Sequence, residues 1–200
     1  MANKKEILIS WTAPIIPSHS LAGIPLGLLA SEFESSLEKY LIDPHCSTYK
    51  FEGSPELVME KHIDLNGNGG FGFGVCNLEL TNWRLYYDSP NHPGVNPNAL
   101  TVIVRSWKVY AVKVWQFEST REGELPVYSY QGKAPIEIGL GNYVKDLLSF
   151  SNLAFDNSEE WFYTDSTYGG LEVTGLGADI DLQDDSEQRI SALCVICATI

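Results

Sequence analysis

Basic residues are scarce in this 200-residue chain: 13 Lys and Arg stand against 26 Asp and Glu, which gives a formal net charge of −13 at pH 7. Nucleic acids and anionic membranes bind through local positive charge, so this scarcity argues against both as partners. It favours a basic protein as the partner, although an acidic balance also serves solubility alone.

Long apolar runs are also missing. No stretch approaches the roughly 18 apolar residues that span a bilayer. The apolar run Ile7 to Trp11 contains a serine, and it is too short for the core of a secretory signal. We therefore expect a cytoplasmic protein with no membrane contact, and we expect this run to form a first strand.

Only four cysteines occur, and Cys194 and Cys197 form the single C-x-x-C of the chain. Positions three apart on a strand point to opposite faces, so these two thiols would not converge on a metal. No second C-x-x-C completes a four-ligand zinc set. We expect buried structural thiols, with no metal and no cofactor.

Catalytic signatures are absent as well. The sequence has no G-x-S-x-G motif, and its four histidines are scattered. The adjacent acids Glu159 and Glu160 are expected to be solvated, not an acid/base pair with separated pKa values. We predict that the protein is not an enzyme. An enzyme that uses His62 or His92 is kept as an alternative.

The glycine-rich stretch "DLNGNGGFGFGV" raises two other possibilities. Gly67, Gly69 and Gly72 have the G-x-G-x-x-G spacing of a dinucleotide loop. Such a loop must open a helix, whose N-terminus receives the phosphates. Here the glycines lead into the strand-like "FGFGV". The stretch therefore predicts a β-hairpin turn and not a nucleotide site.

The same stretch resembles the first part of a calcium loop. Asp64, Asn66 and Asn68 occupy the first three ligand positions, but position 12, which requires a bidentate Glu, is Val75. Whether these three residues bind a cation stays open from the sequence.

Two segments show helical periodicity. In the first, Leu29, Phe33 and Leu37 lie on one face, and Ser31 with Glu34 has the spacing of a capping box. The second covers residues 142–150. Most other segments are rich in Val, Ile and aromatic residues, which is typical of strands. The sequence predicts an α+β protein with an antiparallel sheet, about two helices packed on one face, and the opposite, Trp- and Tyr-rich face open for docking.

An internal repeat is suggested by "IPLG" at 24–27 and "IEIG" at 136–139. Each is followed by a helix-like segment, a Trp-led strand ("WRLYYDS", "WFYTDS") and an apolar strand. We predict a first helix-plus-sheet half at 1–120, a linker at 121–134 and a second, acidic half at 135–200, with packing as a single domain as an alternative. Coincidence among common strand sequences is the competing interpretation of the repeat.

The acidity is concentrated in residues 151–200, which contain ten acids and one base and so carry −9 of the −13. One interpretation is a charged loop that keeps a sheet edge soluble. The sharper one is a surface that attracts a cationic protein and surrounds aromatic anchors, for which a core role is the alternative. The predicted partner-binding residues are Asp179, Asp181, Asp184, Asp185, Glu187, Glu159, Glu160, Trp161, Tyr163 and Tyr168.

The two units of "I-x-φ-G, helix, W-x-Y, antiparallel strands", at about 21–115 and 135–200, resemble the helix-plus-sheet repeats of small inhibitors of the β-lactamase-inhibitor type. As an acidic chain poor in catalytic motifs, the protein also resembles immunity proteins of bacterial polymorphic or contact-dependent toxin systems. The second resemblance implies a protein that binds a cognate toxin, often a basic nuclease, and covers its active site.

The leading hypothesis is therefore a non-catalytic, toxin-neutralising immunity protein with a basic protein partner. The first alternative is a ligand- or glycan-binding module that uses an aromatic sheet face around Phe71 and Phe73, where Gly72 and Gly74 leave room. The second alternative is an uncharacterised enzyme.

Overall fold

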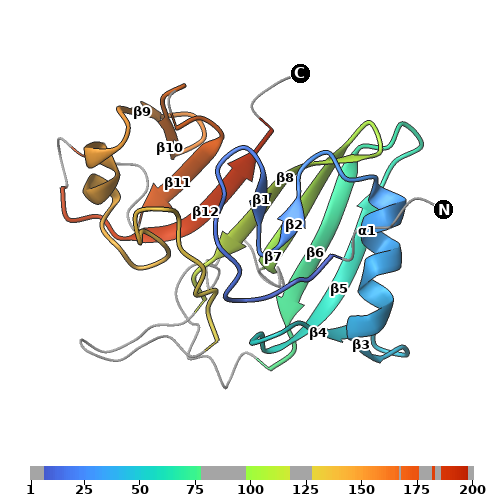
Figure 1. The fold of residues 1–200 in the computed structure, drawn as a ribbon. Helices are drawn as coiled ribbons and strands as arrows, with labels where there is room; N and C mark the ends of the chain where they lie inside the picture. The colour runs from blue at the N-terminus through green and yellow to red at the C-terminus, as the bar shows by residue number, and fades with distance from the viewer. Residues whose placement is uncertain are drawn as a thin grey trace.

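A computed structural model describes residues 7–77, 98–117, 128–166, 168–175, 182 and 186–197. Its main feature is one ten-stranded sheet in the order β3-β4-β5-β6-β7-β8-β12-β11-β10-β9, in which all neighbours are antiparallel (Figure 1). In chain order the strands are β3 (Leu41–Asp43), β4 (Thr48–Lys50), β5 (Glu56–Ile63), β6 (Gly69–Val75), β7 (Asn98–Arg105), β8 (Lys108–Trp115), β9 (Leu153–Asp156), β10 (Trp161–Thr164), β11 (Leu171–Gly175) and β12 (Ile190–Ile196).

The α+β prediction is wrong, because the fold is dominated by its sheet. The described helices are short: α1 (Ala30–Leu37), the 3-10 turn η1 (Glu38–Tyr40) that continues it, and the 3-10 helix η3 (Val144–Ser149). The predicted capping box is not formed, since Leu29 is the N-cap of α1 and makes no side-chain cap bond. The periodicity of Leu29, Phe33 and Leu37 predicts the helix α1. Such a local pattern does not show that the chain enters β3 directly after η1.

The helix α1 covers one face of the sheet at β6. Phe33 of α1 packs edge-on against Phe71 and Phe73, with ring centroids 5.0 and 6.4 Å apart, and all three rings are fully buried. Gly72 and Gly74 alternate with these aromatic residues and so face the other side of the sheet. The two phenylalanines therefore belong to the core. The proposed aromatic binding face around Phe71 and Phe73 is wrong.

The N-terminal segment lies on the same side of the sheet as α1. Its hairpin of β1 (Ser20–Leu21) and β2 (Ile24–Pro25) lies over the sheet, where β1 contacts β8 and β12 (Figure 1). Among the described residues, the predicted strand Ile7 to Trp11 forms one bridge, from Ser10 to Glu52. Trp11 is buried, and its indole N–H donates to the Tyr128 carbonyl at 2.8 Å.

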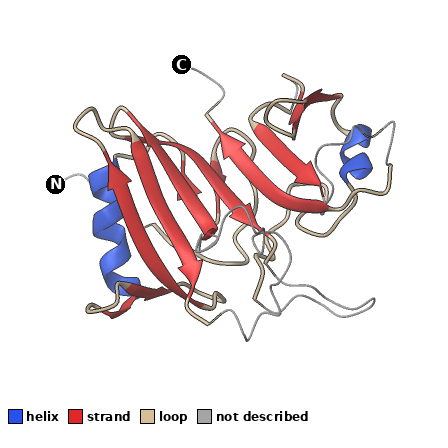
Figure 2. Cartoon of the chain, turned by 180° about the vertical axis from the view of Figure 1, so that it is seen from behind, coloured by secondary structure: helices blue, strands red, loops and turns tan. Residues whose placement is uncertain are grey.

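The two chain segments predicted as halves supply separate groups of strands, β3–β8 and β9–β12. These groups meet where β12 pairs with β8, from Ala192 opposite Trp115 to Ile196 opposite Ala111. Figure 2 shows the sheet from the side away from α1. On this side a second, smaller hydrophobic cluster contains Ala111, Trp161, Ala192 and Cys194.

The glycine-rich stretch forms the turn between β5 and β6, so the hairpin prediction is confirmed. One carboxylate oxygen of Asp64 accepts the backbone N–H groups of Asn66 and Asn68, both at 2.8 Å, and these bonds lower the pKa of Asp64. Asn68 Oδ1 accepts the Ser106 N–H at 3.2 Å. The turn explains the Asp and Asn residues as hydrogen-bonding groups of its own backbone.

Gly69 is the most constrained position of this turn. Its φ is +136°, and a Cβ there would lie 1.9 Å from the His62 carbonyl oxygen on the paired strand. Gly69→Ala should therefore lower the free energy of unfolding by more than about 3 kcal/mol, because backbone strain and a backbone clash add. Chemical denaturation measures the loss.

Gly27→Ala is the matched control. Gly27 also has a positive φ, +77°, but no heavy atom lies within 4 Å of its added Cβ. This change should cost only the left-handed strain, about 1–2 kcal/mol. Equal losses in the two variants would show that the close approach of the paired strand does not constrain residue 69.

Candidate functional site

The face away from α1 carries a compact group of polar and aromatic side chains, which we call the open-face cluster. It comes from four adjacent strands: β8, β12, β11 and β10. One row of it is set by the strand register, with Lys113 opposite Cys194, Cys194 opposite Glu172, and Glu172 opposite Tyr163. The members of the open-face cluster are Lys113, Trp115, Trp161, Tyr163, Glu172 and Cys194.

Two tryptophans and a lysine form one end of the cluster. The rings of Trp115 and Trp161 meet edge-to-face, with centroids 6.0 Å apart. The Lys113 ammonium lies 4.2 Å from the centroid of Trp161 and 5.6 Å from that of Trp115. A cation in this position is attracted by the negative face of each ring. The site therefore already holds one cation against its aromatic wall.

The other end of the cluster is acidic. The side chain of Glu172 is half-buried. Burial raises its pKa, the Lys113 charge opposes this shift, and the negative charge of Glu159 adds to it. Among the described residues, the Glu172 carboxylate has no hydrogen-bond donor and no salt bridge within 4.0 Å. It is thus a partly desolvated charge that accepts no hydrogen bond from a described residue.

Glu159 is held beside the cluster by the turn between β9 and β10. Asp156 begins this turn, and its carboxylate accepts the Ser158 N–H at 2.7 Å, the Ser158 hydroxyl at 2.6 Å and the Glu159 N–H at 3.3 Å. These bonds lower the pKa of Asp156. The Tyr163 hydroxyl then donates to Glu159 at 2.9 Å. Burial, followed by the bond to Glu159, raises the pKa of Tyr163.

Cys194 lies in the middle of the row between Lys113 and Glu172. It is buried, and burial raises the pKa of its thiol to about 12. A thiol with this pKa is neutral at pH 7 and is a weak nucleophile. The prediction of buried thiols holds for Cys194, but it is wrong for Cys46 and Cys76, which are exposed.

Of the predicted site residues, the structure brings Trp161, Tyr163 and Glu159 together. Glu160 is in the same turn and is exposed; its backbone carbonyl accepts the Thr174 hydroxyl at 2.9 Å. Trp161 is a less accessible anchor than expected, with an exposed fraction of 8%. Its burial on this face is explained by the Lys113 and Trp115 side chains against its ring.

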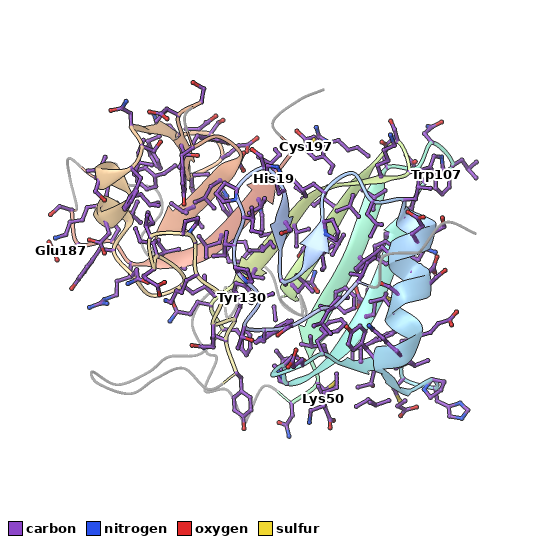
Figure 3. All side chains as sticks on the ribbon, in the orientation of Figure 1. His19, Lys50, Trp107, Tyr130, Glu187 and Cys197 are labelled. Atoms are coloured by element: carbon purple, nitrogen blue, oxygen red, sulfur yellow. The ribbon has the colours of Figure 1, made fainter. Side chains whose placement is uncertain are left out.

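Tyr168 and Glu187 lie elsewhere, which corrects their grouping with Trp161. Tyr168 packs on the main core, with its ring 6.3 Å from that of Phe150. Glu187 pairs with Lys145 of η3, and this contact lowers the pKa of Glu187. Figure 3 shows Glu187 on the η3 side of the molecule. Four predicted site residues lie outside the described residues: Asp179, Asp181, Asp184 and Asp185.

The two histidines of the enzyme alternative are not part of the cluster. His62 is exposed on β5, and His92 lies outside the described residues. Within the described parts of the chain, no group of three or more His, Cys, Asp or Glu residues could hold a metal ion. No described helix is long and apolar enough to cross a membrane.

Sequence reasoning missed Lys113, Trp115 and Glu172. A local signal for them exists, since Lys113 and Trp115 alternate with buried valines in "KVYAVKVW", and Glu172 lies between Leu171 and Val173. This alternation places each residue on the outer face of its own strand. It does not show that β8 and β11 are separated only by β12, which is what brings the three side chains together.

Comparisons with known proteins give little further guidance. No family model and no curated protein matches the chain. Among solved structures, it is similar to the crystal structure of the uncharacterized protein YfeY from Escherichia coli, at 11% sequence identity and a TM-score of 0.42. The match covers 94% of this chain and 99% of that chain. At this TM-score the likeness supports no conclusion about function.

The half-buried carboxylate of Glu172 has a consequence for stability. Because folding raises its pKa, its protonated form stabilises the fold. This contribution is complete below the ordinary glutamate pKa of about 4.3 and is lost as the pH rises through the higher folded-state value. Glu172→Gln should therefore raise the free energy of unfolding at pH 7 by less than about 1 kcal/mol, since the group is half-exposed.

Denaturant unfolding at pH 7 and at pH 4 measures this difference, which should shrink at the lower pH. Glu38→Gln removes the same charge at an exposed glutamate of η1 and is the control. A Glu172→Gln variant less stable than the native protein at pH 7 would mean that the carboxylate has a stabilising partner.

Proposed function

We propose that the protein is a cytoplasmic immunity protein that binds a basic protein toxin through the open-face cluster and the acidic turn beside it. By covering the active site of the toxin, it would act without catalysis of its own. The observation that carries this proposal is the acidic surround of the cluster: Tyr163 donates its hydroxyl to Glu159 at 2.9 Å and lies opposite Glu172 on the neighbouring strand.

The arrangement of aromatic and acidic side chains in the open-face cluster supports the proposal. Stable interfaces place aromatic anchors at their centre and a polar rim around them. Here Trp115, Trp161 and Tyr163 supply the aromatic centre, and Glu159 and Glu160 are exposed at its margin. The anchors stand on hydrogen-bonded strands, so little conformational freedom would be lost on binding.

The charge of the surface suits a toxin whose substrate is anionic. A nuclease cleft must bind phosphate groups and is therefore basic. Complementary charge steers the two proteins together and raises the association rate by roughly 10–10³-fold. The chain as a whole, at −13, adds to the same attraction.

The test begins with the reading frame beside the gene, expressed as the candidate toxin. Its expression should arrest growth, and co-expression of this protein should restore growth. With the purified pair, Glu159→Lys combined with Glu160→Lys should slow association at least about tenfold, because charge reversal removes the steering field. Surface plasmon resonance measures the association rate at several salt concentrations.

A matched control is Glu38→Lys combined with Glu52→Lys, which changes the net charge by the same amount at two exposed glutamates away from the open face. It should slow association far less than the first pair of changes. If both double variants slow it equally, only the net charge matters, and the open face is not the docking surface. Growth arrest that co-expression does not relieve would contradict the immunity function itself.

A further inference from the structure

We infer that the open-face cluster is a receptor for one arginine side chain of the partner, which would contact Tyr163 and Trp161 and pair with the carboxylates of Glu172 and Glu159. This inference rests on the proposed function, because it assigns the arginine to the bound toxin. It adds to the proposed function the chemical group that is bound, a guanidinium, and the place that binds it, the open-face cluster.

Acidic side chains outnumber basic ones around Tyr163, so a cation would be attracted there. Glu172 lies opposite Tyr163, Glu159 accepts the Tyr163 hydroxyl, and the Asp156 carboxylate accepts the Glu159 N–H. The described positive group of this row is Lys113, which is separated from Glu172 by Cys194. Glu159 and Glu172 also repel each other, since the charge of Glu159 disfavours ionisation of Glu172. A guanidinium placed between these two carboxylates would convert their repulsion into attraction to a shared partner.

Lys113 does not fill this role. Its ammonium lies over the Trp161 ring at 4.2 Å, and no salt bridge within 4.0 Å joins it to a described carboxylate. It is therefore held mainly by the aromatic wall. Glu172 remains without a hydrogen-bond donor among the described residues, although a half-buried carboxylate gains more from such a bond than an exposed one.

Lys113 also shows what the aromatic wall can accept. The Lys113 ammonium lies on the face of Trp161, so this ring already makes a cation–π contact, and a second cation could reach the ring only by displacing the ammonium. An incoming guanidinium would take this position from Lys113, whose side chain is half-exposed and can turn away. Arginine fits better than lysine, because its planar group stacks on a ring and carries donors in a fork that reaches two carboxylate groups at once.

The geometry of the receptor is fixed by the sheet. Glu172 and Tyr163 face each other on β11 and β10, and neighbouring strands are about 4.8 Å apart. Glu159 is tied to Tyr163 by the bond from the tyrosine hydroxyl, and the turn that carries Glu159 is tied to Asp156. The carboxylates are therefore held near the ring before any ligand arrives, which lowers the entropic cost of binding.

The test is an NMR titration of the full-length protein with N-acetyl-arginine N-methylamide, observed at the backbone and indole N–H signals. The neutral isostere N-acetyl-citrulline N-methylamide is the ligand control. The arginine compound should shift the signals of Trp161, Tyr163 and Glu172 with saturation in the millimolar range. The citrulline compound should bind at least about tenfold more weakly, because it lacks the charge.

Two variants test whether Glu172 and Lys113 determine the affinity for the arginine compound. Glu172→Gln should lower the affinity for the arginine compound about tenfold while the protein stays folded, since one charge-assisted bond is lost. Lys113→Met should raise the affinity, because it removes the competing cation but keeps an unbranched apolar chain against the tryptophans. Glu38→Gln on η1 is the matched control and should leave the affinity unchanged.

Three results would overturn the inference: equal binding of the citrulline compound, shifts confined to other parts of the surface, or no saturable shift at all. Failure here is distinguishable from failure of the proposed function. If the arginine compound does not bind but charge reversal at Glu159 and Glu160 still weakens toxin binding, the arginine receptor alone is refuted. If the compound binds at the cluster but no toxin is neutralised, the immunity function is refuted, and the cluster is an arginine-binding site whose partner is not a toxin.

Discussion

The pairing of β12 with β8 is the constraint on which the rest of the structure depends. It joins a group of strands from early in the chain to a group from its end, through residues about 80 positions apart, as Val114 opposite Leu193 shows. The same pairing buries Cys194 and places it between Lys113 and Glu172. Without it there would be two smaller sheets, and neither would carry the open-face cluster.

The two faces of the sheet differ because of what covers them. On one face, α1 and the N-terminal segment supply Phe33, Trp11 and Leu21 to a continuous core. On the other, the cluster around Trp161 gains its burial from its own strands. A sheet face of this kind keeps charged groups such as Lys113 and Glu172 half-buried, and a half-buried charge gains free energy when it finds a partner.

The glycine-rich stretch has the spacing of a nucleotide-binding loop but forms a hairpin turn. Its spacing matches a nucleotide loop, yet Gly69 starts strand β6 and Asp64 is engaged by the backbone of its own turn. Local rules of turn chemistry were sufficient to predict this hairpin. They were not sufficient for the first helix, whose periodicity was correct but which lacks the predicted cap and is only a small part of a sheet-dominated fold.

The sequence by itself determined the local features: the acidic balance, the turn at Asp64 to Asn68, the face of Phe33 and the alternation within each strand. These follow from charge and from interactions between residues close together in the chain. Only the tertiary structure decided that Tyr168 and Glu187 lie apart from Trp161, and that Lys113 and Glu172 flank Cys194. Strand order and register depend on contacts between distant segments, and alternation places a side chain on a face without naming its neighbour across the sheet.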